Sequence, residues 1–182
     1  MKAERVAASR VLGGPAGALP VERTALVARV RDALYASKIV SYTQGFDLMR
    51  TMGASKGWAL DLGGIAGIWR GGCIIRARFL NRITEAYRAE PELRNLMLAP
   101  FFRDALNAAQ GAWRAVVAMA VQHGVPVPAM SASLAYYDAY RSARLPANLL
   151  QAQRDFFGAH TYERIDRPAG ERFHTAWPEV IE

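Results

Sequence analysis

The 182-residue sequence is poor in cysteine and histidine, and this scarcity limits the chemistry it can carry. Its single cysteine, Cys73, cannot form an internal disulfide, and the apolar residues beside it predict a buried thiol. The three histidines, His123, His160 and His174, are widely spaced, so they form no metal-ligand motif. We therefore expect neither a disulfide scaffold nor a bound metal.

Long hydrophobic runs are also missing. No apolar run approaches the roughly 18 residues needed to span a bilayer, so no membrane partner is expected. The first ten residues, MKAERVAASR, carry charges where a signal peptide needs its apolar segment, and Glu4 counts against a transit peptide. An apolar fraction of 52% and a charged fraction of 21% are typical of a globular domain. We expect a cytoplasmic protein.

Lysine is scarce, although the net charge is +7: of 23 basic residues, only Lys2, Lys38 and Lys56 are lysines. Such a balance can indicate nucleic-acid binding. The arginines, however, are scattered beside acids, and no basic run with interleaved aromatics occurs, so we expect no nucleic-acid partner. Two interpretations stay open. The arginines either form an ordinary solvated surface or bind a phosphorylated small molecule, since guanidinium matches phosphate oxygens.

Strand patterns are absent, and helical spacing runs through nearly the whole chain. Residues 21–52 carry apolar side chains at three- and four-residue steps, followed by small residues that suit close helix neighbours. A helix beginning at Pro100 has the clearest amphipathic stripe: Phe102, Leu106, Ala109, Trp113, Val116 and Ala120. His123 and Gly124 then end it, with a glycine where a left-handed cap is needed. We predict an all-α fold, a helical bundle over residues 1–157 with an irregular tail over 158–182.

Glycines recur every fourth residue after Asp61, at Gly63, Gly67 and Gly71. The surrounding GGIAGIWRGG is not a phosphate-binding loop, because no strand precedes it and no Gly-Lys-Ser/Thr follows. We expect close helix packing on one glycine face. The helical pattern continues over residues 73–89.

The stretch QAQRDFFGAHTYERID, residues 151–166, holds the candidate site. Pro146 is placed to begin a helix, and Gly158 to follow its last residue. Arg154 falls on the border of an apolar face made by Leu149, Leu150, Phe156 and Phe157. His160 follows the glycine break closely enough to fold back over the helix end. The two groups can converge on one anion, or Arg154 can pair with Asp155 or Glu163 as an ordinary surface arginine.

Five segments carry a family resemblance: ALYASKIVSYTQGF (33–46), IWRGGCIIRARFL (68–80), NLMLAPFF (95–102), AYYDAYRSARLPANLLQAQRDFFGAHTYERID (135–166) and FHTAW (173–177). From about Lys2 to Trp177 the chain resembles the C-terminal helical domain of decarboxylating 6-phosphogluconate dehydrogenase. The resemblance implies oxidation of 6-phosphogluconate with NADP, giving ribulose 5-phosphate and carbon dioxide. It also implies a homodimer in which Arg154 and His160 bind substrate in the neighbouring subunit's site, with the tail reaching that subunit.

Other parts of that family's machinery are not found in this sequence. No strand leads into G-x-G-x-x-G, so we expect no residue here to bind NADP. None of the three lysines lies in the motif of the family's general base, so no catalytic residue is expected either. We expect a truncated, split or excised C-terminal piece that is inactive alone. It either supplies substrate ligands and dimer surface to an active dehydrogenase or is a non-catalytic dimerisation remnant.

Overall fold

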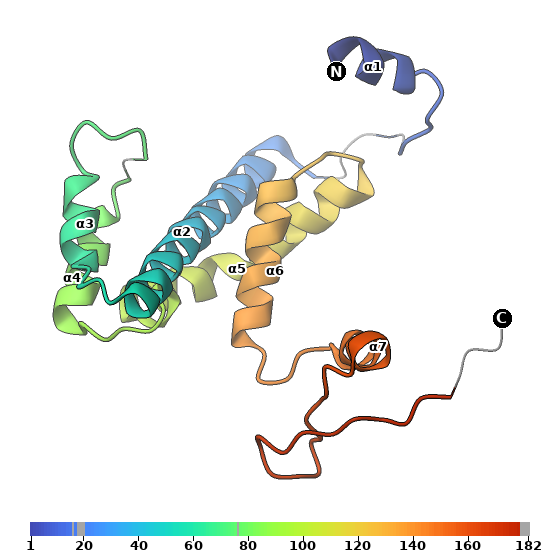
Figure 1. Ribbon diagram of the computed structural model, residues 1–182. Helices are drawn as coiled ribbons and strands as arrows, with labels where there is room; N and C mark the ends of the chain where they lie inside the picture. Colours follow the sequence, from blue (N-terminus) through green and yellow to red (C-terminus); the bar gives the residue numbers. More distant parts are fainter. Residues whose placement is uncertain (16, 18–20, 76, 179–182) are drawn as a thin grey trace. The chain divides into compact units, whose positions relative to one another are not determined.

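The computed structural model describes residues 1–15, 17, 21–75 and 77–178. Figure 1 shows its elements in chain order: α1 (Lys2–Ala8), α2 (Arg23–Lys56), α3 (Leu62–Ile68), α4 (Leu80–Ala89), the 3₁₀ helix η1 (Leu96–Leu98), α5 (Pro100–Gln122), α6 (Pro128–Arg141) and α7 (Asn148–Gly158). Within the described residues the only β pairing is an isolated bridge between Tyr162 and Phe173. The all-α prediction is confirmed.

The chain divides into two compact units, Met1–Asp138 and Ala139–Glu182. In the first unit the long helix α2 packs along α5, and α3 packs on α4. The Glu22 carboxylate begins α2 by accepting hydrogen bonds from the Thr24 and Ala25 amides, at 2.7 and 2.9 Å. None of the helices in the described parts of the chain is long and apolar enough to cross a membrane.

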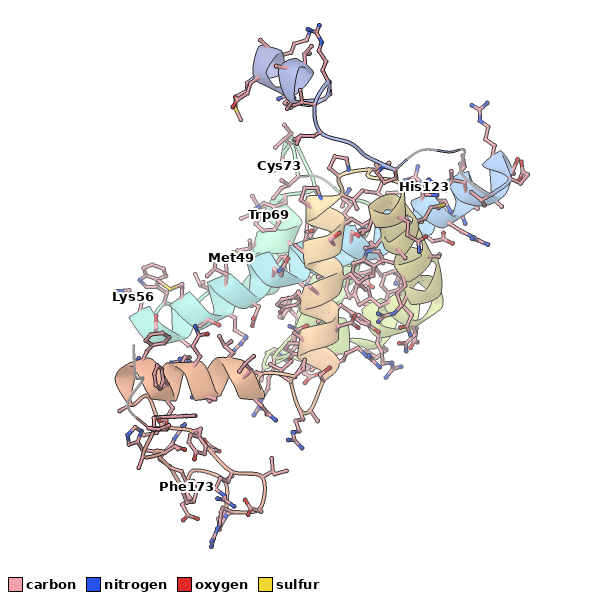
Figure 2. All side chains as sticks on the ribbon, turned by 90° about the vertical axis from the view of Figure 1, so that its right-hand side faces the viewer. Met49, Lys56, Trp69, Cys73, His123 and Phe173 are labelled. Atoms are coloured by element: carbon pink, nitrogen blue, oxygen red, sulfur yellow. The ribbon has the colours of Figure 1, made fainter. Side chains whose placement is uncertain are left out.

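The stripe predicted for α5 is buried at all six positions. Pro100 occupies the start of the helix, where a missing amide hydrogen costs nothing. Trp113 is fully buried, and its indole N–H donates to the Met130 carbonyl 3.3 Å away. Beyond the helix, Gly124 adopts a left-handed φ of 65° as the cap prediction requires; His123, at this end of the helix, is labelled in Figure 2.

The first turns of α2 are less buried than their spacing predicts. Val27, Val30 and Leu34 are all exposed, whereas the small residues Ala33 and Ala36 are fully buried. The helix therefore turns its small side chains toward the core of the first unit, and its larger apolar ones outward at this end. Spacing identifies a helical face but not which of two faces a neighbour covers.

Close glycine packing occurs at one of the three predicted positions. A Cβ at Gly63 would lie 3.4 Å from the Thr84 carbonyl oxygen and 3.5 Å from Tyr87 Cβ, both in α4. Nothing lies within 4 Å of a Cβ at Gly67 or Gly71. The prediction is right for Gly63 and wrong for the other two: Gly67 is in α3 but no neighbour approaches it, and Gly71 lies beyond the end of α3 at Ile68.

The helix predicted over residues 73–89 begins only at Leu80. Gly72, which precedes this segment, has a left-handed φ of 72° and breaks the helical conformation there. The residues between are irregular as far as they are described, residue 76 lying outside that description. Ile74 is fully exposed and Cys73 is only half-buried, so the predicted core position of the thiol is wrong. Figure 2 labels Cys73 on this connection.

The helix α7 of the second unit is shorter than predicted at its start and longer at its end. It begins at Asn148, so Pro146 does not occupy its first position. Gly158 is its last residue, and the left-handed cap is Ala159, with φ 49°. The predicted capping role of Gly158 is therefore wrong. An irregular tail follows, in which Tyr162 and Phe173 exchange two backbone hydrogen bonds of 2.9 Å.

Candidate functional site

Arg154 lies in the last turns of α7, and His160 in the turn that follows it. Both side chains line one open hollow of about 910 Å³, formed by α7, the connection before it and the tail. All of its lining residues belong to the second unit. The structure thus brings the two predicted site residues to the same cavity. Both residues are exposed.

Arginines dominate the charges of this hollow. Arg164 donates to Asp166 at 2.8 and 2.6 Å, and Arg172 forms an ion pair with Glu163 at 3.1 Å. Neither hydrogen bond nor ion pair joins Arg154 to any other residue that the structure describes. The surface pairing considered for it is not formed, because Glu163 binds Arg172 and Asp155 faces the tail.

Two left-handed residues flank His160. Ala159 has φ 49° and Thr161 has φ 61°, a conformation that is costly for non-glycine residues and most of all for a β-branched one. The Ala159 amide donates to the Asp155 carbonyl at 2.9 Å, and the Thr161 amide donates to Asp155 Oδ1 at 3.0 Å. Gln151 Nε2 donates to the Thr161 carbonyl oxygen. These bonds hold the turn in its strained shape.

The imidazole of His160 lies against the end of α7, as predicted from its place after the break. A Cβ added to Gly158 would lie 2.9 Å from both Cδ2 and Nε2 of His160. Real Cβ atoms essentially never approach so closely. A side chain at position 158 would therefore displace the His160 ring, whereas the backbone angles of Gly158 do not demand glycine.

The residue that organises this unit is Asp155, which sequence reasoning considered only as a surface partner of Arg154. It is completely buried. Besides the Thr161 amide, its carboxylate accepts hydrogen bonds from three donors of the tail, each at 3.0 Å: His174 Nδ1, the Thr175 amide and Trp177 Nε1.

Burial by itself raises the pKa of Asp155. The hydrogen bonds from the Thr175 amide, His174 and Trp177 outweigh this effect and lower the pKa from 3.8 to about 2. The carboxylate is therefore ionised at neutral pH despite its burial. The sequence signal for these contacts is weak: the tail has no helical pattern, and its His174 and Trp177 side chains carry N–H donors that need acceptors.

Aromatic residues of the tail find contacts within their own chain. The Tyr162 and Phe173 rings lie 6.3 Å apart, and Trp177 packs edge-on against Phe156 of α7 at 5.8 Å. Figure 2 labels Phe173 in this tail. Each of these three tail rings is half-buried by contacts within its own chain.

The apolar face predicted on α7 is largely open to solvent. Leu149 is 85% exposed, Leu150 59% and Phe157 76%. Only Phe156, which contacts Trp177, is better covered. The described residues contain no group of three or more His, Cys, Asp or Glu side chains able to hold a metal ion.

The family model for the C-terminal domain of 6-phosphogluconate dehydrogenase matches residues 1–177. The chain belongs to this family. It is 56% identical to the rice chloroplastic enzyme named 6-phosphogluconate dehydrogenase, decarboxylating 2, over 99% of the chain and 36% of that protein. It is 54% identical to the decarboxylating 6-phosphogluconate dehydrogenase of Escherichia coli K12, over 97% of the chain and 37% of that protein.

A solved 6-phosphogluconate dehydrogenase from Plasmodium falciparum has the same fold, with a TM-score of 0.86 and 42% identity. The match covers 97% of this chain and 38% of that one. The Plasmodium enzyme is known in its apo form, with its cofactor NADP⁺ and with its substrate 6-phosphogluconate. The chain thus spans little more than a third of the length of these relatives and corresponds to their C-terminal domain.

Proposed function

We propose that this chain is the substrate-binding and dimer-forming part of an NADP-dependent, decarboxylating 6-phosphogluconate dehydrogenase. In this proposal Arg154 and His160 bind 6-phosphogluconate in the active site of a neighbouring subunit. The observation that carries it is the hollow of the second unit, where both residues are exposed without a partner among the described residues.

The chemistry of the two side chains suits a sugar phosphate. A guanidinium offers two parallel N–H donors that match phosphate or carboxylate oxygens, and an imidazole adds a further donor. Arg164 and Arg172 already hold acids, so they contribute little free positive charge to the hollow. Arg154 and Arg144, the other arginine that lines the hollow, form no ion pair with any described residue and are therefore the two arginines left to receive an anion.

Donation to a neighbouring subunit is supported by the exposed apolar face of α7. Leu149, Leu150 and Phe157 lie on the same helix as Arg154. Burying them against a second copy would be favourable, at roughly 25 cal/mol per Å² of apolar surface. A two-fold dimer gives each copy the same contact, so each could complete the other's site.

Hydride transfer needs groups that we do not assign to this chain. The described residues contain no strand-to-helix glycine turn of the kind that binds a dinucleotide pyrophosphate, so we propose no NADP-binding residue here. NADP, when bound elsewhere in the full enzyme, accepts the hydride. We expect the 182-residue chain by itself to be inactive with 6-phosphogluconate and NADP, and we propose the cytoplasm as its location.

The test is complementation. A full-length enzyme of the family, with its matching arginine and histidine both changed to alanine, is co-expressed with this chain, and the heterodimer is purified. Losing a charge-assisted hydrogen bond costs about 1.5–3 kcal/mol, so the wild-type chain should lower the KM for 6-phosphogluconate by roughly ten-fold or more. Arg154→Ala should abolish this rescue, and Arg154→Lys should restore part of it, because an ammonium cannot form the bidentate fork.

The matched control is Arg103→Ala, which removes an exposed arginine of α5 that pairs with Asp104 in the first unit. It should leave the rescue intact. Heterodimers whose KM stays as poor as that of the double-alanine enzyme would refute substrate binding by Arg154 and His160. The dimerisation remnant would then be the better description of the chain.

A further inference from the structure

Asp155 is hydrogen-bonded both to the turn after α7 and to residues 174–177 of the tail. Its backbone carbonyl and its carboxylate together receive the amides of Ala159 and Thr161, the residues on either side of His160. Its carboxylate also receives three donors from residues 174–177, about twenty positions further along the chain. A single buried side chain therefore restrains the turn before the tail and the end of the tail.

The turn needs such a restraint because it is strained. A left-handed Thr161 is unfavourable on its own, and such conformations persist only where surrounding contacts determine them. Gly158 supplies the space for the His160 ring, but it does not hold the backbone that carries the ring. The hydrogen bond from Thr161 to the Asp155 carboxylate and the one from Gln151 to the Thr161 carbonyl are the contacts that do so.

We propose that Asp155 is a positioning residue, whose buried carboxylate fixes the strained turn that presents His160 to the hollow beside Arg154. It touches no substrate itself and acts through His160. The proposal rests on the proposed function for its catalytic consequence, but the structural effect on His160 can be measured separately. An alternative is that Asp155 only fastens the tail, with no influence on the histidine.

The structural test uses the isotope-labelled 182-residue chain and nuclear Overhauser contacts between the His160 ring protons and the Gly158 α-protons. These contacts should be strong in the wild type, since the ring lies against Gly158. Asp155→Leu, which keeps a similar size and removes both acceptor oxygens, should abolish them. The control Glu171→Gln neutralises an exposed tail acid outside the hollow and should preserve them. Contacts that persist in Asp155→Leu would overturn the proposal.

A milder change distinguishes the loss of this one bond from unfolding of the whole second unit in Asp155→Leu. Replacing the Thr161 amide by an ester, through incorporation of the α-hydroxy analogue, removes only the N–H that Asp155 Oδ1 accepts. The bonds from His174, Thr175 and Trp177 remain. The ester should weaken the His160–Gly158 contacts while the Trp177 indole resonance stays unchanged. Unaltered histidine contacts in the ester would leave tail fastening as the only role of Asp155.

The kinetic test uses the complementing heterodimer and a double-mutant cycle. Asp155→Leu should raise the KM nearly as much as His160→Ala, with a smaller effect on kcat. In the His160→Ala background it should add no more than about two-fold, because residues that act through one another are not additive. An equal rise in both backgrounds would contradict positioning through His160. If His160→Ala itself leaves the KM unchanged, the proposed function fails, while the nuclear Overhauser result still decides the role of Asp155.

Discussion

Replacing Gly158 by alanine should separate the stability of α7 from the function of His160. An added Cβ would lie 2.9 Å from two ring atoms, whereas ordinary contact begins at 3.4 Å, so the ring must move by at least 0.5 Å. The obstacle is a side chain that can rotate, so the backbone need not be disturbed. Alanine also loses less conformational entropy than glycine in a helix, which favours the variant by about 0.5–1 kcal/mol.

The expected outcome is a protein that is equally or more stable but binds substrate less well. A gain of about 1 kcal/mol corresponds to roughly 2–4 °C in melting temperature for a chain of this size. Misplacing a substrate-positioning group by 1 Å can cost about a hundred-fold, so a shift of half that size should raise the KM of the complementing heterodimer by about ten-fold. Melting temperature and KM are measured on the same preparations.

Gly111 in α5 provides the matched control. It is a helical glycine whose Cβ would meet nothing within 4 Å, so Gly111→Ala should gain stability without changing the KM. If Gly158→Ala keeps the wild-type KM, the position of the ring against the helix end is irrelevant to binding. That result would refute a link between this close contact and substrate binding.

Four further predictions concern the rest of the chain. Because the pKa of Asp155 is lowered from 3.8 to about 2, its bonds to the tail are kept above pH 4 and lost as the pH falls toward 2. The bound-state indole resonance of Trp177 should disappear over that range, and its persistence at pH 1 would contradict the pairing. Trp113→Ala should lower the free energy of unfolding by about 3–5 kcal/mol in urea titrations, since the ring is fully buried; a loss below 1 kcal/mol would be inconsistent with that burial. Ala159→Gly should stabilise the second unit by up to about 1 kcal/mol, because glycine adopts φ 49° without strain, and a lower melting temperature would argue against this backbone. Sedimentation equilibrium at micromolar concentration should show a two-fold dimer that deletion of residues 159–182 weakens, and a folded monomer would exclude it.

Local patterns predicted the fold where one signal was repeated many times. The stripe of α5 has six members at regular steps, so an error at one position would not have changed the conclusion. Single proline and glycine signals were less reliable. Pro146 and Gly158 each lie within two residues of a true boundary of α7, but neither occupies the position that its residue type prefers.

The end of α7 shows why such single signals fail. The preference of glycine for left-handed backbone predicts Gly158 as the cap, yet Ala159 takes that conformation. Hydrogen bonds from Ala159 and Thr161 to Asp155 offset the strain, and the His160 ring occupies the space that a Cβ at Gly158 would fill. Those contacts depend on tertiary structure, so no local preference could have predicted them.

Neighbouring residues of α7 have opposite surroundings. Successive helical side chains point about 100° apart, so Arg154 reaches the hollow while Asp155 points into the unit. An exposed carboxylate next to the proposed substrate site would repel an anionic substrate. Here the buried Asp155 carboxylate accepts hydrogen bonds from four donors, including His174. These donors partly offset its negative charge and so weaken its repulsion of an anion in the hollow. The Arg-Asp pair in the sequence is thus not an ion pair: the acid shapes the second unit, and the arginine stays available for a ligand.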